Sequence, residues 1–292
     1  MPVLTNPRAE RVRSVRALSG RSSRLRTGRF VVEGPQGVRE AVREAPGRIH
    51  DLYVTAMAAA RYPDIVGSAH SGGVRVHEAS DEVLAAMSAD AQGLVAVMDV
   101  VAPLLSDVLS RGPRLVAILA RVRDPGNAGT VIRAADAAGA DAVILTGESV
   151  ELHNPKVVRA TAGSLFHLPV VTGPSLAETV LAARAAGLSV LAADGAGDLD
   201  LDDLADVADV AGGAGASTVP DLTHPTAWVF GNEAWGLSDE DRALADGVVR
   251  VPIWGRAESL NLATAATVCL YASARAHRST ARSSAVASDG SH

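Results

Sequence analysis

Three short segments of the sequence combine glycines with polar side chains directly after predicted buried strands. The first contains Asn127, Gly129 and Arg133, and it follows an apolar run at residues 115–119. The second and third, at residues 229–237 and 251–263, follow two later apolar runs. Ligands of open α/β sheets bind outside the carboxyl ends of the strands, so we expect these segments to meet at one site.

The second and third segments carry further groups that could shape a pocket or orient a substrate. Gly231 and Gly236 flank Glu233 in a loop that leads into a helix, and glycines there favour positive φ or close approach of a ligand. Ser259 and Asn261 stand at the start of the last predicted helix. Asn261 lies between two leucines on a helix that must bury an apolar face, which indicates a role beyond solvation.

Simpler structural roles also fit four of these residues. Asn127 and Ser259 are typical of helix N-caps. Arg133 suits a solvated helix face, and Glu233 suits a turn. Each segment is therefore weak by itself, and the order and combination of the three carry the argument.

Common nucleotide-binding and cysteine-based sites are excluded by single residues. The only lysine, Lys156, does not follow a glycine, so a Walker A loop is absent. Gly195 and Gly197 follow a predicted strand, but Asp200 replaces the third glycine of a dinucleotide fingerprint, which argues against a Rossmann enzyme. A single cysteine, Cys269, excludes an internal disulfide and a cysteine-cluster metal site. We expect a cytoplasmic protein without a metal.

Charge is distributed unevenly along the chain. The formal net charge is −6, yet residues 1–29 hold eight arginines against Glu10 alone. Such a basic stripe can bind nucleic-acid phosphates even on an acidic protein, although a solvated helix face also fits it. No apolar run approaches the ~20 residues of a membrane span, so we expect no membrane segment. The predicted phosphate-binding residues are Arg8, Arg11, Arg13, Arg24 and Arg26.

Hydrophobic periodicity predicts two α/β domains and a tail. Residues 1–102 alternate short strands and helices in a small domain. Residues 103–278 alternate continuous apolar strands with helices, which indicates a parallel sheet covered on both faces. Within it, residues 194–225 are rich in aspartate and glycine, and we expect an acidic flexible insertion with one short helix. The serine-rich residues 279–292 are expected to be disordered.

Taken together and in this order, the three segments resemble the SpoU (TrmH) family of SPOUT methyltransferases over residues 115–278. Residues 30–34 and 92–97 are similar to that family's L30e-like substrate-binding domain. The resemblance implies an RNA 2′-O-methyltransferase that uses S-adenosylmethionine. It also implies a SPOUT-type parallel sheet with a C-terminal trefoil knot, and a homodimer in which the first segment faces the partner's cofactor.

The resemblance carries roles onto individual residues. Arg133 corresponds to the arginine that activates the ribose hydroxyl. An arginine is protonated at neutral pH, so it needs help from a phosphate or carboxylate, or it stabilises the developing alkoxide. The implied catalytic set is Arg133, Asn127, Glu233, Ser259 and Asn261. The implied cofactor-binding set is Gly231, Val251, Leu260, Gly236 and Ile253.

The substrate is the least determined part of this interpretation. A separate RNA-binding domain suits a large folded target, so we expect ribosomal RNA. A transfer-RNA 2′-O-methyltransferase is one alternative, and a non-catalytic RNA-binding protein with a degenerate pocket is another. Retention of the polar residues in all three segments argues against the second alternative. The target nucleotide and any role in antibiotic resistance are left open by the sequence.

Overall fold

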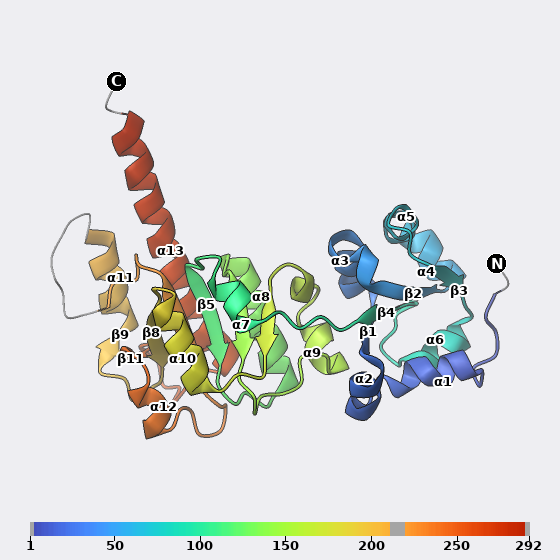
Figure 1. Cartoon of the computed structure of the whole chain (residues 1–292), viewed down its shortest axis with the longest axis horizontal. Coiled ribbons are helices and arrows are strands. Elements are labelled where there is room, and N and C mark those ends of the chain that lie inside the picture. The colour runs from blue at the N-terminus through green and yellow to red at the C-terminus, as the bar shows by residue number, and fades with distance from the viewer. Residues whose placement is uncertain (1–2, 211–219, 290–292) are drawn as a thin grey trace. The chain divides into compact units, whose positions relative to one another are not determined.

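The computed structural model describes residues 3–210 and 220–289 (Figure 1). The chain forms two compact units. Met1–Val101 and Glu151–His167 make up unit 1, while Ala102–Val150 and Leu168–His292 make up unit 2. The segment Glu151–His167 thus belongs by its contacts to unit 1, whereas we expected one continuous second domain from residue 103 to 278.

Unit 1 is built on a four-stranded sheet in the order β1-β4-β2-β3. Strand β4 is antiparallel to both β1 and β2, and β3 is parallel to β2. Its strands are β1 (Arg29–Glu33), β2 (Ile49–Val54), β3 (Val76–Glu78) and β4 (Leu94–Asp99). Its helices are α1 (Glu10–Ala17), α2 (Arg21–Thr27), α3 (Pro35–Glu44), η1 (Pro46–Arg48), α4 (Ala56–Arg61), α5 (Pro63–Ser71), α6 (Asp81–Met87), α9 (Pro155–Ala160) and η2 (Ser164–Phe166).

Specific contacts hold the segment 151–167 in unit 1. Arg24 forms a salt bridge with Glu151, and the rings of Phe30 and His153 lie 4.5 Å apart between centroids. Helix α9 then contacts β1. These buried contacts join residues that are far apart in sequence, and hydrophobic periodicity could not assign them to one unit.

Unit 2 is built on a seven-stranded parallel sheet in the order β7-β6-β5-β10-β8-β11-β9. This confirms the expected parallel sheet. Its strands are β5 (Leu115–Leu119), β6 (Ala142–Leu145), β7 (Val170–Thr172), β8 (Ser189–Ala193), β9 (Leu199–Asp200), β10 (Thr226–Phe230) and β11 (Gly247–Arg250). Its helices are α7 (Leu105–Leu109), α8 (Pro125–Ala138), α10 (Leu176–Ala185), α11 (Leu201–Val210), α12 (Asp239–Ala243) and α13 (Leu262–Asp289).

Helices cover both faces of this sheet (Figure 1). On one face, Val116 and Ile118 of β5 share a hydrophobic core with α7 and α10. On the other face α13 contacts α8, β5 and β10, and the indole of Trp228 on β10 donates a 2.9 Å hydrogen bond to Ser273 of α13. Alternate strand residues point to opposite faces, so apolar residues at every position are explained by burial on both sides.

The acidic insertion is more ordered than we expected. Strand β9 pairs with β11, and α11 buries Leu201 and Leu204. The leucines of this segment provide an apolar helix face that its aspartates concealed in the composition. Residues 211–219, the glycine-rich part of the predicted insertion, lie outside the described residues.

The expected disordered tail is also largely helical. Helix α13 continues to Asp289. Besides its serines, the stretch 279–289 contains Ala281, Ala285 and Ala287, and alanine is the strongest helix former. Residues 290–292 lie outside the described part of the chain. Among the described helices, none combines the length and the hydropathy needed to cross a membrane.

Candidate active site

Three loops at one edge of the unit 2 sheet enclose a pocket of about 340 Å³. They follow β8, β10 and β11, which are adjacent parallel strands, so their carboxyl ends meet at the same edge. Residues 193–195, 230–236 and 251–262 contribute to the lining. The second and third predicted segments therefore converge, and a loop that the sequence did not single out joins them.

The pocket brings together all of the residues predicted to bind the cofactor. Gly231, Gly236, Val251, Ile253 and Leu260 line it. The side chains of Ile253 and Leu260 are 38% and 36% exposed, although both are apolar. Exposed apolar side chains in a concave site are typical of a ligand-binding surface, because a bound apolar group would remove them from water.

The loop after β10 is closed by its own backbone. Asn232 and Gly236 exchange two backbone hydrogen bonds of 3.0 and 2.8 Å. Gly236 has a φ of +65°, and a Cβ on Gly231 would lie 2.5 Å from the carbonyl carbon of Gly236. Only glycine at position 231 allows this approach, because a real Cβ cannot come so close to backbone atoms. The two glycines thus shape this wall of the pocket.

A chain of side-chain hydrogen bonds joins the three predicted segments. The Nδ2 of Asn127 donates to Oε1 of Glu233 at 3.2 Å, and the Nδ2 of Asn261 donates to Oδ1 of Asn127 at 3.0 Å. Glu233 also accepts backbone N–H bonds from Arg123 and Asp124, at 3.4 and 3.3 Å. The first segment therefore reaches the pocket through Asn127, beside the lining residue Glu233.

The helix caps differ from the simpler roles that the sequence allowed. Asp124 caps α8, and its carboxylate accepts the backbone N–H of Asn127 at 2.7 Å. Asn261 caps α13, and its Oδ1 accepts the backbone N–H of Ala263 at 2.9 Å. Ser259 lies before this cap and lines the pocket. Neither Asn127 nor Ser259 therefore has the capping role that the sequence allowed as an alternative, and the side chain of Asn127 instead bonds Glu233 and Asn261.

A charged cluster that the sequence analysis missed supports the same loops. Asp194, directly after β8, accepts the backbone N–H of Leu237 at 3.3 Å and lies 3.4 Å from the guanidinium of Arg242. Arg121 pairs with the buried Asp241 at the start of α12. The only signal for Asp194 was a carboxylate at the end of an apolar strand, and we assigned it to the flexible insertion.

Arg133 does not join this cluster within one chain. It lies on α8, is exposed, and does not line the pocket. Among the described residues it has neither a hydrogen-bond partner nor an ion-pair partner within the chain. It lies six positions after Asn127, which at 100° per residue places the two side chains on different sides of the helix.

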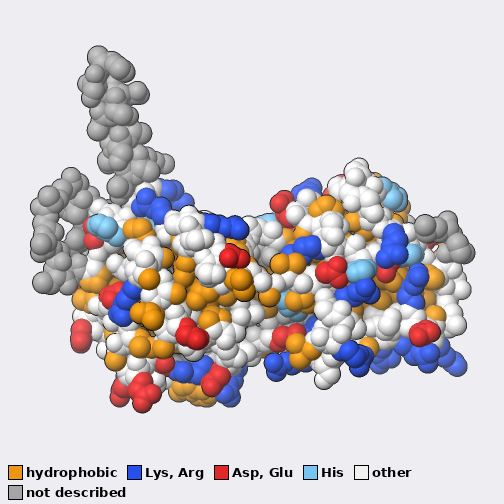
Figure 2. All heavy atoms as spheres, viewed as in Figure 1, with side chains coloured by type: hydrophobic (Ala, Val, Ile, Leu, Met, Phe, Trp, Pro, Cys, Tyr) orange, Lys and Arg blue, Asp and Glu red, His pale blue; other side chains and the backbone are white. Residues whose placement is uncertain are grey.

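Four of the five predicted phosphate-binding arginines are exposed in unit 1, and one is not. Arg8, Arg11, Arg13 and Arg26 are exposed on or beside α1 and α2. Figure 2 shows Arg and Lys side chains gathered along the edge of unit 1 that carries these helices.

Arg24 is a correction to the predicted set. It is only 4% exposed. Its guanidinium donates to both carboxylate oxygens of Glu151 and to the backbone oxygens of Leu18 and Ser19. A side chain with its donors engaged in the interior cannot meet a phosphate, so Arg24 is a structural residue.

Comparison with known protein families shows the family to which the chain belongs. Residues 114–271, more than half of the chain, match the model of the SpoU rRNA Methylase family, and residues 9–96 match an MRM3-like substrate binding domain. The chain belongs to the SpoU rRNA methylase family. The matched region contains the three pocket loops together with Asn127, Glu233 and Asn261.

Individual relatives of this SpoU family member agree with the assignment. A 23S rRNA (guanosine-2′-O-)-methyltransferase from Bordetella pertussis is 32% identical over 84% of this chain and 96% of its own length. A 23S rRNA (uridine(2479)-2′-O)-methyltransferase from Streptomyces viridochromogenes is 39% identical over 62% of this chain, and the alignment spans only 60% of that protein. The crystal structure of an AdoMet-bound rRNA methyltransferase from Sinorhizobium meliloti superimposes with a TM-score of 0.77 at 30% identity, covering 94% of this chain and 97% of that one.

Within the SpoU family match, the segment 151–167 has an unusual place. It falls inside the residues matched to the methylase model, yet its contacts lie in unit 1. The match to the methylase family runs without a break through this segment. The packing instead assigns the segment to unit 1, which also contains the match to the substrate-binding domain.

Proposed function

We propose that this protein transfers a methyl group from S-adenosylmethionine to a ribose 2′-hydroxyl of ribosomal RNA. The observation that carries the proposal is the three-loop pocket, in which exposed apolar side chains lie beside a hydrogen-bonded Asn127–Glu233 pair. Relatives named as 23S rRNA 2′-O-methyltransferases support both the reaction and the class of RNA. A ribosomal RNA substrate agrees with action in the cytoplasm.

The pocket fits the chemistry of this cofactor. Val251, Ile253 and Leu260 offer apolar surface for the adenine, and Glu233 and Glu258 place carboxylates in the lining. Carboxylates favour a cationic sulfonium over a neutral ligand. When bound, S-adenosylmethionine supplies an electrophilic methyl group on a good leaving group, so catalysis depends mainly on alignment and on loss of the hydroxyl proton.

The polar residues of the chain would provide that alignment. Asn127 and Asn261 each have their amide engaged on both sides, so their orientation is fixed. The Ser259 hydroxyl lines the pocket beside Leu260 and has no hydrogen-bond partner among the described residues. We assign it to hold the ribose, and we assign Glu233 to hold the first segment in place.

We also propose that the protein acts as a homodimer, and the position of Arg133 supports this. This side chain is exposed and lies outside the pocket of its own chain, so it would act in the pocket of a second copy. The α8–α13 face also exposes apolar side chains, including Val268 and Tyr271, which a second copy would cover. In that arrangement the guanidinium would stabilise the negative charge that develops on the 2′ oxygen.

We also propose that unit 2 contains the trefoil knot of SPOUT proteins. Strands β10, β8 and β11 are neighbours out of chain order, and α13 returns from β11 to contact β10 and β5. A knotted chain that is pulled from its ends should reach an unfolded extension shorter than its contour length in single-molecule force experiments. A full contour length would contradict the knot.

The proposed activity is tested by mapping 2′-O-methyl groups in ribosomal and transfer RNA from cells with and without the gene. We expect one ribosomal site to lose its methyl group and the purified protein to restore it with S-adenosylmethionine. Calorimetry measures cofactor binding separately. If a transfer-RNA site loses its methyl group instead, the substrate is transfer RNA and not ribosomal RNA. If S-adenosylmethionine does not bind at millimolar concentration, a non-catalytic RNA-binding protein is favoured.

A further inference from the structure

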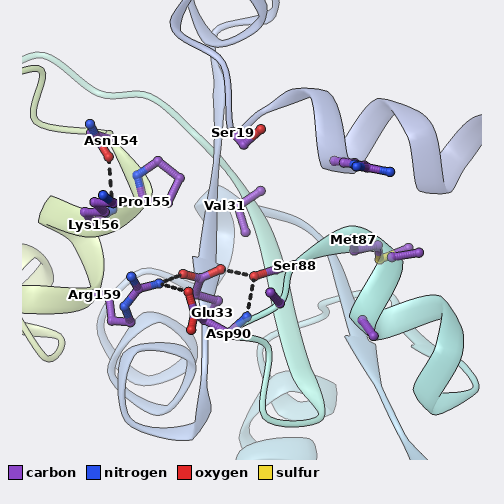
Figure 3. Close-up of a pocket in the computed structure, with 14 residues that line it drawn as sticks. Ser19, Val31, Glu33, Met87, Ser88, Asp90, Asn154, Pro155, Lys156 and Arg159 are labelled. Carbon is purple, nitrogen blue, oxygen red and sulfur yellow. Dashed lines mark hydrogen bonds and ion pairs between the residues drawn. The ribbon is translucent and has the colours of Figure 1, made fainter.

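Unit 1 contains a second cavity of about 470 Å³, separate from the three-loop pocket. It is lined by residues from α1, β1, the end of α6 and the start of α9, all within one compact unit (Figure 3). Asn154 and Lys156 lie on one side of it, Met87 on the other, and Ser19 and Val31 between them (Figure 3). Nothing in the proposed methyl transfer uses these residues.

The acidic groups of this cavity, Glu33 and Asp90, share one cation, and that pairing leaves a single negative charge against the two further cations of the lining. Arg159 pairs with both Glu33 and Asp90, the latter at 2.7 Å, and the hydroxyl of Ser88 donates to Glu33 (Figure 3). Glu33 is buried, and both of its carboxylate oxygens are engaged. This cluster therefore holds α9 against β1, and its carboxylates are not free to bind a cation.

Two cations at the same cavity have no such partner. Arg16 and Lys156 both line it and both are exposed. Neither side chain forms a hydrogen bond or an ion pair with any residue that the structure describes. They come from α1 and α9, far apart in the sequence, and the fold of unit 1 places them around one cavity. Two unpaired cations at a cavity favour an anion, and phosphate is the anion of RNA.

The remaining lining suits a base. Val31, Met87 and the neighbouring Ala85, Ala86 and Ala89 form an apolar wall, and methionine adapts readily to aromatic surfaces. Asn154 accepts the backbone N–H of Lys156 through Oδ1, which leaves its Nδ2 as a donor without a partner among the described residues. An apolar wall with a few polar groups is typical of a site for a small planar ligand, and unstacked RNA bases are recognised through hydrogen bonds to their edges.

We propose that this cavity binds one unstacked nucleotide of the RNA substrate, away from the methylated ribose. Arg16 and Lys156 bind the phosphate, the apolar wall contacts the base, and Nδ2 of Asn154 donates to an acceptor on the base edge. Arg16 lies on α1, the same helix as the exposed Arg11 and Arg13, so an RNA strand whose phosphates contact those arginines would also reach the cavity. The inference rests on the proposed function, because it identifies how the same RNA is held.

The test replaces both cations in the full-length protein. Arg16→Ala/Lys156→Ala should weaken binding of the methylated ribosomal RNA fragment by at least about tenfold near physiological salt, because two phosphate contacts are lost. The slope of log K against log salt should also become shallower by ~0.7–0.9 for each lost contact. Affinity for S-adenosylmethionine should not change, since the cavity lies outside the three-loop pocket. Arg61→Ala, at an exposed arginine of α4 outside the cavity, is the matched control and should bind RNA normally.

A second variant tests the base contact without removing a structural bond. Asn154→Asp retains the oxygen that caps α9 but loses the Nδ2 donor. We expect crosslinks from 4-thiouridine-substituted RNA to residues 85–90 in the wild type, and a changed nucleotide preference in this variant. RNA affinity and salt dependence that match the wild type in the double variant, with crosslinks only elsewhere, would overturn the proposal.

Other outcomes separate this inference from the proposed activity. If the wild type neither binds S-adenosylmethionine nor methylates RNA, the proposed function fails. If the wild type methylates and the double variant does so with unchanged RNA affinity, only the cavity assignment fails. A double variant that binds protein-free RNA normally but loses affinity for intact ribosomal particles would assign the cavity to a ribosomal protein and would also overturn the inference.

Discussion

The side-chain amide of Asn261 donates a 3.0 Å hydrogen bond to the side-chain oxygen of Asn127. This contact fixes the direction of a whole chain of bonds. Oδ1 of Asn261 already accepts the backbone N–H of Ala263, so its Nδ2 must face Asn127. The oxygen of Asn127 then faces Asn261, and its Nδ2 donates to Glu233. One ordered hydrogen-bond network thereby connects the N-cap of α13, the first segment and the loop after β10.

Asn261→Asp separates the cap from this network. The carboxylate still accepts the N–H groups at the start of α13, and Asp is as good an N-cap as Asn. It cannot donate to Asn127, however, and a rotation of the Asn127 amide would turn its oxygen toward the carboxylate of Glu233. We expect methyl transfer to fall by about 10–100-fold, a loss of ~1.4–2.8 kcal/mol of transition-state stabilisation, with a nearly unchanged melting temperature. Single-turnover methylation measures it, and wild-type rates would show that the contact is dispensable.

Gly231→Ala tests the shape of the pocket. The added Cβ would lie 2.5 Å from a backbone carbon of Gly236, so the loop after β10 must open. We expect binding of S-adenosylmethionine to weaken by at least about tenfold, or ~1.4 kcal/mol. Gly255→Ala, in the loop before α13 but with open space around its Cβ, is the matched control. Calorimetry compares the two, and equal affinities would remove Gly231 from the cofactor site.

Arg133 is tested by complementation between subunits. At a cofactor concentration well below the weakened Kd of the Gly231→Ala pocket, Arg133→Ala and Gly231→Ala should each greatly reduce methylation, the first by removing the guanidinium and the second by disrupting the pocket. Dimers that contain one of each variant hold one intact site if Arg133 acts on the second copy. Unfolding and refolding an equimolar mixture should therefore restore about a quarter of wild-type activity. No recovery, with mixed dimers confirmed by mass spectrometry, would place Arg133 in its own subunit's site or outside catalysis.

Replacing the four exposed arginines of the basic stripe at residues 1–29 that were predicted to bind phosphate should weaken RNA binding without affecting the fold. Alanine at Arg8, Arg11, Arg13 and Arg26 should lower affinity and flatten the salt dependence, since each phosphate contact contributes ~0.7–0.9 to the slope of log K against log salt. The melting temperature should stay close to that of the wild type. An unchanged slope would show that these four arginines do not contact the backbone of RNA.

Arg24→Ala should have the opposite effect, because it should lower the stability of the fold and not the number of phosphate contacts. It leaves Glu151 without its bidentate partner in a largely buried position, which costs roughly 2–4 kcal/mol after allowance for the partial exposure of the carboxylate. Arg24→Lys should restore little, because an ammonium cannot replace the planar fork. Chemical denaturation measures the free energy of unfolding. Full stability of Arg24→Ala would contradict the structural role.

Acid should destabilise unit 1 through His153. Burial is the main cause that lowers the pKa of His153 to about 4 from an ordinary value of 6.5. Glu151 opposes this shift, and Arg48 and Arg24 add to it. The unfolded chain therefore takes up the proton first as pH falls. The stability contribution is complete above pH ~6.5 and is lost between pH ~6.5 and ~4, by up to about 3 kcal/mol.

This pH dependence is checked by denaturation at several pH values. His153→Gln should flatten the slope between pH 6.5 and 4, whereas His70→Gln, at an exposed histidine of α5, should leave it unchanged. A His153→Gln protein with the same slope as the wild type would assign the acid sensitivity to other groups.

The sequence by itself determined the local elements and the chemistry of the three segments. Apolar runs such as residues 115–119 became central parallel strands because burial on both faces requires apolar residues at every position. Gly231 and Gly236 marked the tight loop because backbone atoms leave no room for a Cβ at position 231 and because position 236 has a positive φ. These properties depend on residues near one another along the chain, so their signals are present in the sequence itself.

Only the tertiary structure decided which partners these residues have. Arg24 had the same local signal as Arg26, yet burial against Glu151 makes one structural and leaves the other exposed. Asp194 was assigned to a flexible insertion, and the order of the strands turned it into a support of the pocket. The segment 151–167 joined unit 1 for the same reason. Contacts between distant residues follow from strand order and packing, and neither is encoded in local spacing.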